Sequence, residues 1–156
     1  MIIRNIIIVL GVIAATIYGG LYLITRPHTL TPTEALSEFR NAAPNISVDG
    51  FNVTDAIRSP SDHFGDYSFV ISFNISSNRI ESIQKEFTSS LKATNSWEIS
   101  TSPYDIGAYD KGLCGEKKWI VPAGASILKH YGPGDRYKMV GIDYANRVIF
   151  FYCMYW

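Results

Sequence analysis

The chain opens with a long apolar run. No charged residue occurs between Ile6 and Ile24, and Arg4 and Arg26 stand on either side. A helix over this stretch would be about 28 Å long, close to the thickness of a bilayer's hydrocarbon core. A cleaved signal peptide is the alternative, but it needs a shorter apolar core followed by a small-residue cleavage site. We therefore predict a retained transmembrane helix over residues 6–24.

The positive charges on the two sides of this helix, which influence its orientation in a membrane, are nearly balanced. Arg4 and the amino terminus lie on one side, whereas Arg26 and His28 lie on the other. Because the leading segment is short, we expect the N-terminus to stay inside. The protein would then be a single-pass membrane protein with its domain on the periplasmic or extracellular side.

Small residues recur at every fourth position within the run, at Gly11, Ala15 and Gly19. Residues with this spacing share one helix face, and small side chains let two membrane helices approach closely. Helix–helix pairing in the membrane is therefore one interpretation. The other is that small residues are simply common in membrane spans.

Helix and strand patterns alternate after the apolar run. The sequence Thr31–Glu34 forms a capping box with proline at the first helical position, which predicts a helix over 32–43. Apolar residues at every second position over 67–75 predict a strand with one buried face and one mostly polar face. Asn78 can cap a second helix over 79–94.

The remaining patterns are shorter. They predict strands near 48–53, 97–100 and 118–121, loops over 56–65, 122–126 and 131–135, and a hairpin of 137–144 with 148–156. The last strand, VIFFYCMYW, is apolar on both faces. It is either a central strand buried between two layers or an aromatic surface for a partner.

These elements together predict an α+β fold. We expect a single N-terminal transmembrane helix, followed by a small domain with a mainly antiparallel sheet and about two helices. The boundaries are 1–25 for the anchor, 26–31 for a juxtamembrane linker and 32–156 for the exported domain.

Composition narrows the functional classes. The 156 residues include 14 basic and 14 acidic side chains, so the formal net charge is zero. Nucleic-acid binding needs a basic excess that releases counterions, and we expect no nucleic-acid partner. A hydrophobic content of 47% is too high for a disordered chain.

The two cysteines, Cys114 and Cys153, are too few for a disulfide-rich mini-protein or a four-cysteine zinc site. In an exported domain they could pair and close a loop of roughly 40 residues. We predict this disulfide on the condition that the domain is exported.

Catalytic and metal motifs are weak. Asp62, His63 and Asp66 are the densest group of ligand-type residues, but their spacing matches no recognised metal loop, and turn formation explains the aspartates equally well. No phosphate-binding glycine motif or nucleophile–base arrangement is present. We predict no cofactor and no catalytic residue, and favour a protein that is not an enzyme.

Aromatic residues crowd the last third of the chain, and interfaces favour such rings. We expect binding through Tyr131, Tyr137, Tyr155 and Trp156. The resulting hypothesis is a membrane-tethered envelope protein, held in the bilayer by its N-terminal helix, whose domain binds another protein. It would act as an accessory subunit of an envelope complex or as an inhibitor or immunity protein. The alternatives are a small envelope hydrolase and a glycan-binding module.

Overall fold

The computed structural model describes residues 2–24, 26–60, 66–92, 96–106, 119–132 and 136–155. The helices are α1 (Ile2–Ile24), α2 (Pro32–Ala42) and α3 (Ile80–Ser90). The strands are β1 (His28–Thr29), β2 (Phe51–Arg58), β3 (Tyr67–Ile75), β4 (Glu98–Ile99), β5 (Tyr104–Asp105), β6 (Ile120–Val121), β7 (Ser126–Gly132), β8 (Arg136–Asp143) and β9 (Val148–Tyr155).

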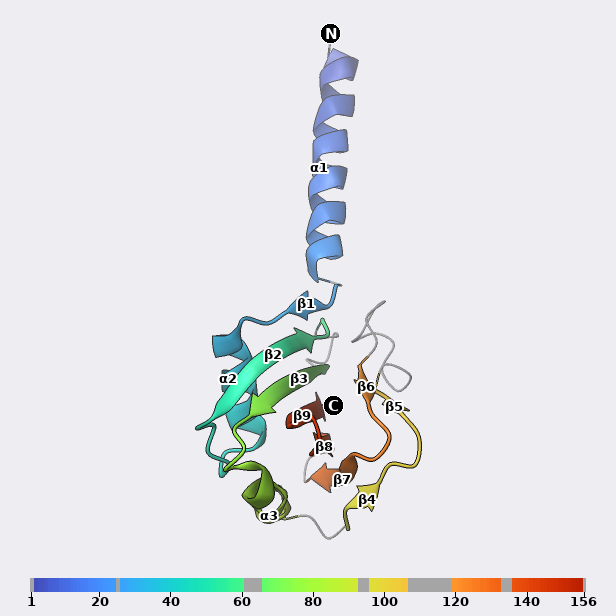
Figure 1. The fold of residues 1–156 in the computed structure, drawn as a ribbon. Helices are drawn as coiled ribbons and strands as arrows, with labels where there is room; N and C mark the ends of the chain where they lie inside the picture. The colour runs from blue at the N-terminus through green and yellow to red at the C-terminus, as the bar shows by residue number, and fades with distance from the viewer. Residues whose placement is uncertain are drawn as a thin grey trace.

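A seven-stranded antiparallel sheet forms the centre of the domain (Figure 1). Its strand order is β1-β2-β3-β9-β8-β7-β4, and β5 and β6 form a separate two-stranded sheet. The predicted hairpin is present, with Asp143 of β8 paired to Val148 of β9. The predicted small domain with a mainly antiparallel sheet is therefore confirmed, and the described chain contains three helices.

Helix α2 begins as the capping box predicts. The Thr31 hydroxyl accepts a hydrogen bond from the Glu34 backbone N–H, and the Glu34 carboxylate accepts from the Thr31 backbone at 2.8 Å. These hydrogen bonds lower the pKa of Glu34, because they favour the charged carboxylate. The helix packs Phe39 onto the sheet, with ring centroids 5.1 Å from Phe73 and 4.9 Å from Phe151.

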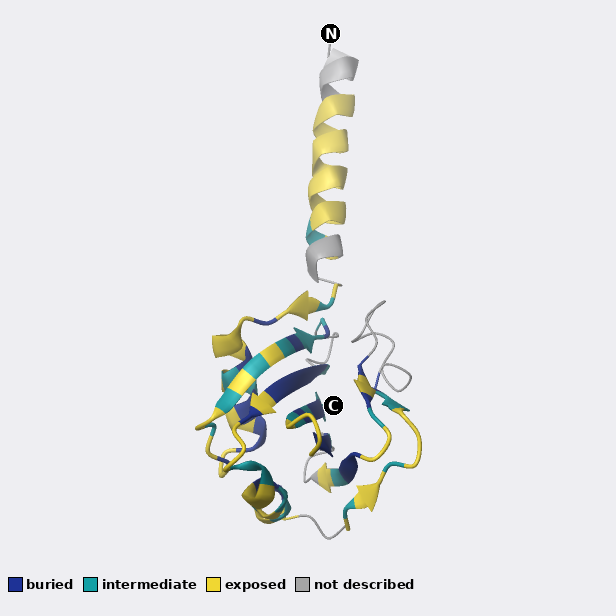
Figure 2. Ribbon diagram, viewed as in Figure 1, coloured by how far each residue is buried: buried dark blue, intermediate teal, exposed yellow. Residues whose placement is uncertain are grey.

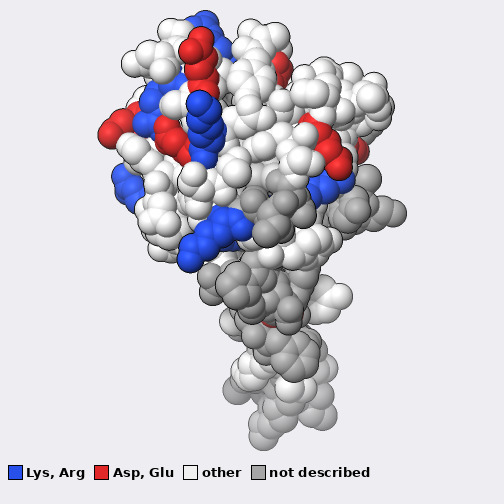
Figure 3. All heavy atoms as spheres, turned by 90° about the horizontal axis from the view of Figure 1, so that it is seen from below, with Lys and Arg blue, Asp and Glu red and all other residues white. Residues whose placement is uncertain are grey.

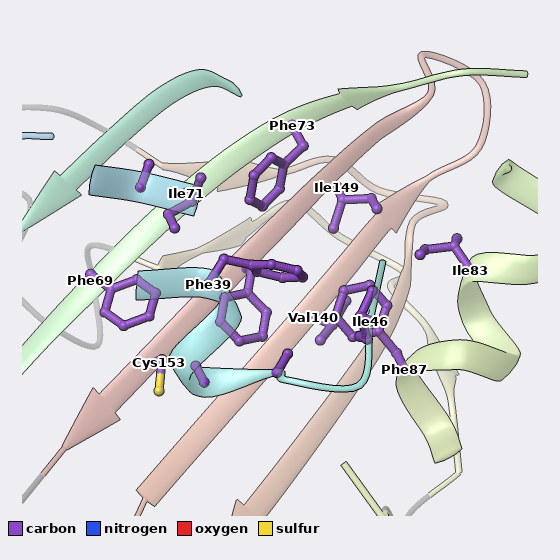
Figure 4. Close-up of a cluster of buried hydrophobic side chains, with 14 of the residues drawn as sticks. Phe39, Ile46, Phe69, Ile71, Phe73, Ile83, Phe87, Val140, Ile149 and Cys153 are labelled. Atoms are coloured by element: carbon purple, nitrogen blue, oxygen red, sulfur yellow. The ribbon is translucent and has the colours of Figure 1, made fainter. Parts of the chain in front are cut away.

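Two hydrophobic clusters cover opposite faces of the large sheet. We call the first the helix-side cluster, because Phe39 of α2 and Phe87 of α3 pack there against strand residues such as Phe73 (Figure 4). The second, the strand-side cluster, lies under β5 and β6 and includes Val121 and Tyr152. The sheet is therefore covered on both faces.

Strand β9 is the central strand, since it lies between β3 and β8 and has buried residues on both faces. Of the two interpretations of the last strand, the buried central strand is therefore the correct one. The predicted polar face of β3, in contrast, is wrong: Ser68 and Ser72 are buried along with their apolar neighbours (Figure 2). The second layer, β5 and β6, supplies the cover that the sequence pattern does not indicate.

Three predicted boundaries are corrected. Residues 56–58, expected in a loop, continue strand β2. Strand β7 extends through Gly132 into a segment expected to be a loop. The cap of α3 is Arg79 rather than Asn78, and it makes no side-chain capping hydrogen bond.

Helix α1 extends away from the sheet (Figure 1). The described side chains within it run from Ile7 to Leu21 and are almost all exposed. Within the described residues, no helix reaches the length and hydropathy of a membrane span. The transmembrane part of the predicted architecture is therefore not supported by the described residues and stays a prediction.

Candidate protein-binding interface

A small hollow lies at the edge of the large sheet farthest from α1 in strand order. Its volume is about 190 Å³, and it is lined by Glu98, Ile99, Ser100, Thr101, Ser102, Tyr104, Ile127 and Lys129. Backbone hydrogen bonds shape its rim: Ser100 N–H donates to the Ala125 carbonyl at 2.9 Å, and Gly124 N–H donates to the Ser100 carbonyl at 2.8 Å. These bonds fix the turn that follows β4 against the start of β7.

A cation and an aromatic ring meet in this hollow. The Lys129 ammonium lies 4.9 Å from the centroid of the Tyr104 ring. Ammonium groups at this distance from an aromatic face are attracted by the ring's quadrupole. The pair brings together β7 and β5, which belong to different sheets.

Tyr131 continues the same surface along β7. It lies two residues beyond Lys129, so both side chains are on the same face of the strand. The Tyr131 side chain is 69% exposed, and its ring centroid is 4.9 Å from that of Tyr137. Ile99, on the neighbouring edge strand, is 65% exposed and lines the hollow, but it pairs with Ser126, so its side chain belongs to the opposite face of the sheet. We call Tyr104, Lys129 and Tyr131 the far-edge patch.

The other predicted binding residues have different surroundings. Tyr137 is buried in the strand-side cluster, where it supports Tyr131 from below and does not offer its ring to a partner. Tyr155 is partly buried and stacks on Tyr67, with ring centroids 4.7 Å apart. Trp156 lies outside the described residues. Of the three predicted residues that the structure describes, Tyr131 alone is an exposed aromatic side chain.

A larger hollow of about 430 Å³ lies beside α3 and is lined by Asn45, Lys85, Glu86, Ser89 and Ser90. Its walls are polar and contain no aromatic ring. Glu86 is already engaged, because it accepts a hydrogen bond from Arg79 at 2.7 Å and another from Ser82 at 2.8 Å. The far-edge patch is the better candidate, since interfaces favour exposed apolar and aromatic groups.

The predicted disulfide is not tested, because Cys114 lies outside the described residues. Cys153 is buried in the helix-side cluster. Ile106 and Trp119, which flank the undescribed segment 107–118, both belong to the strand-side cluster on the opposite face of the sheet. A disulfide would therefore have to join Cys153, on one face of the sheet, to a segment whose two ends both lie on the other face.

The weak metal candidates are only partly described. Asp62 and His63 lie outside the described residues, and Asp66 is partly buried. Among the described residues, no group of three or more histidine, cysteine or acidic side chains could hold a metal ion. Gly11, Ala15 and Gly19 are exposed on α1, and a Cβ added at either glycine would meet no atom within 4 Å.

A partly buried polar cluster joins α2 to the sheet. Glu38 of α2 accepts hydrogen bonds from Arg58 of β2 at 2.9 Å and from the Tyr67 hydroxyl of β3 at 3.2 Å. The Arg58 guanidinium also lies 3.8 Å from the centroid of the Tyr67 ring. Burial, and then the Glu38 charge, raise the pKa of Tyr67. No local motif joins these three residues, so only the fold reveals the cluster.

On the face of the molecule that Figure 3 shows, charge does not single out another surface. Seen from below the view of Figure 1, basic and acidic side chains lie next to one another and no broad patch of one sign is visible (Figure 3). This distribution agrees with the neutral net charge of the whole chain.

No protein-family model, no curated protein and no solved structure matches this chain. Its residues and its fold are therefore the evidence on its function.

Proposed function

We propose that the protein is a membrane-tethered envelope protein whose exported domain binds another protein without catalysis. Its role would be that of an accessory subunit of an envelope complex, or of an inhibitor or immunity protein. The observation that carries the binding proposal is the far-edge patch, where an exposed tyrosine and a lysine–tyrosine pair adjoin a hollow.

Two features support a membrane anchor at α1: its uncharged sequence and the exposure of its apolar side chains. No charged residue lies between Ile6 and Ile24. Ile7, Ile8 and Val9 are each more than half exposed, and successive residues of a helix point about 100° apart, so these three side chains face different sides of it. Large apolar side chains exposed around a whole helix are unfavourable in water and favourable in lipid. A bilayer would remove this surface from water.

The patch has features expected of a protein interface. Exposed tyrosine supplies a large apolar area with a polar tip, and it loses little side-chain entropy when it is immobilised. Tyr137 holds the Tyr131 ring from the buried side, so part of that entropy is already lost before binding. The patch also contains two tyrosines, and tyrosine is one of the residues that are enriched at the energetically important centres of interfaces.

Site-specific photocross-linking tests this proposal. A benzophenone amino acid replaces Tyr131 in the full-length membrane-bound protein, and the same amino acid replaces Tyr144 as the matched control. Tyr144 is also an exposed tyrosine, but its hydroxyl donates to Gln84 of α3, which packs on the opposite face of the sheet from Lys129 and Tyr131. We expect a discrete protein adduct from position 131 and a much weaker one from position 144.

The outcomes distinguish the alternatives. Equal adducts from both positions, or a protein adduct from position 144 alone, would contradict binding through the far-edge patch. An adduct with a glycan from position 131 would favour the glycan-binding alternative instead.

A further inference from the structure

The segment between α1 and the domain is very short. Helix α1 ends at Ile24 and strand β1 begins at His28. Four steps between Cα atoms span at most about 15 Å. Pro27 fixes its own backbone angle and restricts the residue before it to extended conformations. The connection is therefore short, and its backbone is restricted at residues 26 and 27.

The residues after this connection are fastened to the sheet at once. His28 pairs with Arg58, and Leu30 N–H donates to the Ala56 carbonyl at 3.1 Å. Leu30 is buried, and Thr31 then caps α2. The Glu38–Arg58 ion pair further ties α2 to β2. The β1 edge of the sheet is consequently held close to the end of α1.

The far-edge patch lies at the other edge of the same sheet. Six strand spacings separate β1 from β4 in the observed strand order. At about 4.8 Å per spacing, the two edges are roughly 29 Å apart. Figure 1 shows α1 joining the domain at the β1 side, while β4 and β7 lie at the opposite end.

We infer that the sheet stands edge-on to the bilayer and holds the far-edge patch about 30 Å beyond the β1 edge, out of reach of the lipid headgroups. The partner contact is then a folded part of a protein that stands outside the bilayer. It is neither a transmembrane helix nor a lipid headgroup. This inference rests on the proposed function, because it requires α1 to lie in the membrane.

Quenching of a fluorescent label by nitroxide lipids tests the inference. Single cysteines replace Thr29 on β1 and Thr101 beside the patch, both of which are exposed. The background is the full chain with Cys114→Ser, and Cys153 is retained because it is buried. Each variant is labelled with a small environment-sensitive dye and reconstituted into phosphatidylcholine vesicles that carry a nitroxide on the headgroup.

We expect the label at position 29 to lose most of its fluorescence and the label at position 101 to keep nearly all of it. Similar quenching at both positions would mean that the sheet lies flat on the membrane, and would overturn the inference. Absence of quenching at position 29 would overturn it as well, because the β1 edge would then not be near the headgroups.

A third label separates this inference from the proposed function. The label replaces Ile8 in the middle of α1, and the nitroxide is moved to the acyl chain. Strong quenching at position 8 means that the anchor is in the bilayer, so that positions 29 and 101 then test the orientation alone. If position 8 is not quenched, the tether itself is wrong, and the inference fails with it.

Discussion

Gly141 lies at a close approach between the small sheet and the large one. A Cβ built on this residue of β8 would lie 2.8 Å from one methyl carbon of Val121 and 3.1 Å from the other. Val121 belongs to β6 and is fully buried. The absence of a side chain at residue 141 therefore lets β6 pack against β8.

We predict that Gly141→Ala destabilises the domain by about 1–3 kcal/mol, the usual cost of inserting a methyl group into a packed core. Chemical denaturation of the full chain measures the loss. Combining the change with Val121→Ala should recover part of it, because the smaller side chain makes room. A single Gly141→Ala variant as stable as the parent would show that β6 moves aside without cost.

His130 connects stability to pH. Burial, and then the nearby Lys138 ammonium, lower its pKa from the ordinary value of 6.5. Lys138 cannot easily move away, since its ammonium donates to the Ala42 carbonyl at the end of α2 at 2.6 Å. The folded state therefore disfavours the charged imidazole relative to the unfolded state.

The sign of the pH effect follows from this lowered pKa. The unfolded chain binds the proton more tightly, so the His130 contribution is fully present above about pH 6.5 and is lost as the pH falls through the lower folded-state pKa. We predict that the free energy of unfolding falls on acidification below about pH 6.5, and falls less in His130→Gln. Identical pH profiles for the two proteins would contradict the prediction.

At the scale of elements, local chemistry predicted α2 better than α3. The capping box at Thr31 uses only neighbouring residues, and it forms as expected. The cap of α3 is decided by distant contacts instead. Arg79 donates to Glu86 at 2.7 Å and to the Ser47 carbonyl at 3.2 Å, and its backbone already has helical angles. Asn78 therefore does not serve as the cap.

We predict that Thr31→Ala costs about 0.5–2 kcal/mol of stability, because the first turn of α2 loses the hydroxyl that caps it. Thr33→Ala is the matched control: Thr33 is an exposed threonine two residues further along the same turn. Thermal or chemical unfolding compares the two variants. Equal effects would mean that the capping box contributes little and that the packing of Phe39 dominates.

Strand β7 is longer than the turn signal in the sequence predicts. The Tyr-Gly-Pro-Gly sequence at 131–134 signals a turn, and the residues before it show no clear alternation. Pairing with β8 nevertheless extends β7 through Tyr131 and Gly132. This hairpin pairing also places Tyr131 beside Tyr137.

Across the whole molecule, the sequence predicted the antiparallel sheet, two domain helices and the final hairpin, but not the second layer. The alternation of apolar and polar residues predicts that Ser68 and Ser72 lie on a solvent-facing side of β3. They tolerate burial because the Ser68 backbone donates to Ser59 and the Ser72 hydroxyl bonds to Thr54. Buried polar groups that find partners in this way leave no signature in a hydrophobic pattern.

The candidate interface was predicted even less completely. Aromatic character alone predicts binding through Tyr131, and it equally predicts binding through Tyr137, which is buried. Tyr104 and Lys129 meet only because β5 and β7 come together in space, so their pairing depends on the tertiary fold. Residue type indicated which rings are available, whereas topology decides which of them are exposed.

The central position of β9 also bears on how the chain folds as it is synthesised. Strand β3 needs β9 as its inner neighbour, and Tyr67 pairs with Tyr155 across this junction. Until β9 leaves the ribosome, β1, β2 and β3 present an open, largely apolar edge, and β7 and β8 have nothing to join. Open edges of this kind are prone to aggregation. The nascent chain would therefore depend on a chaperone or on rapid delivery to a membrane, and a stop codon just before β9 would leave two half-sheets with no shared core.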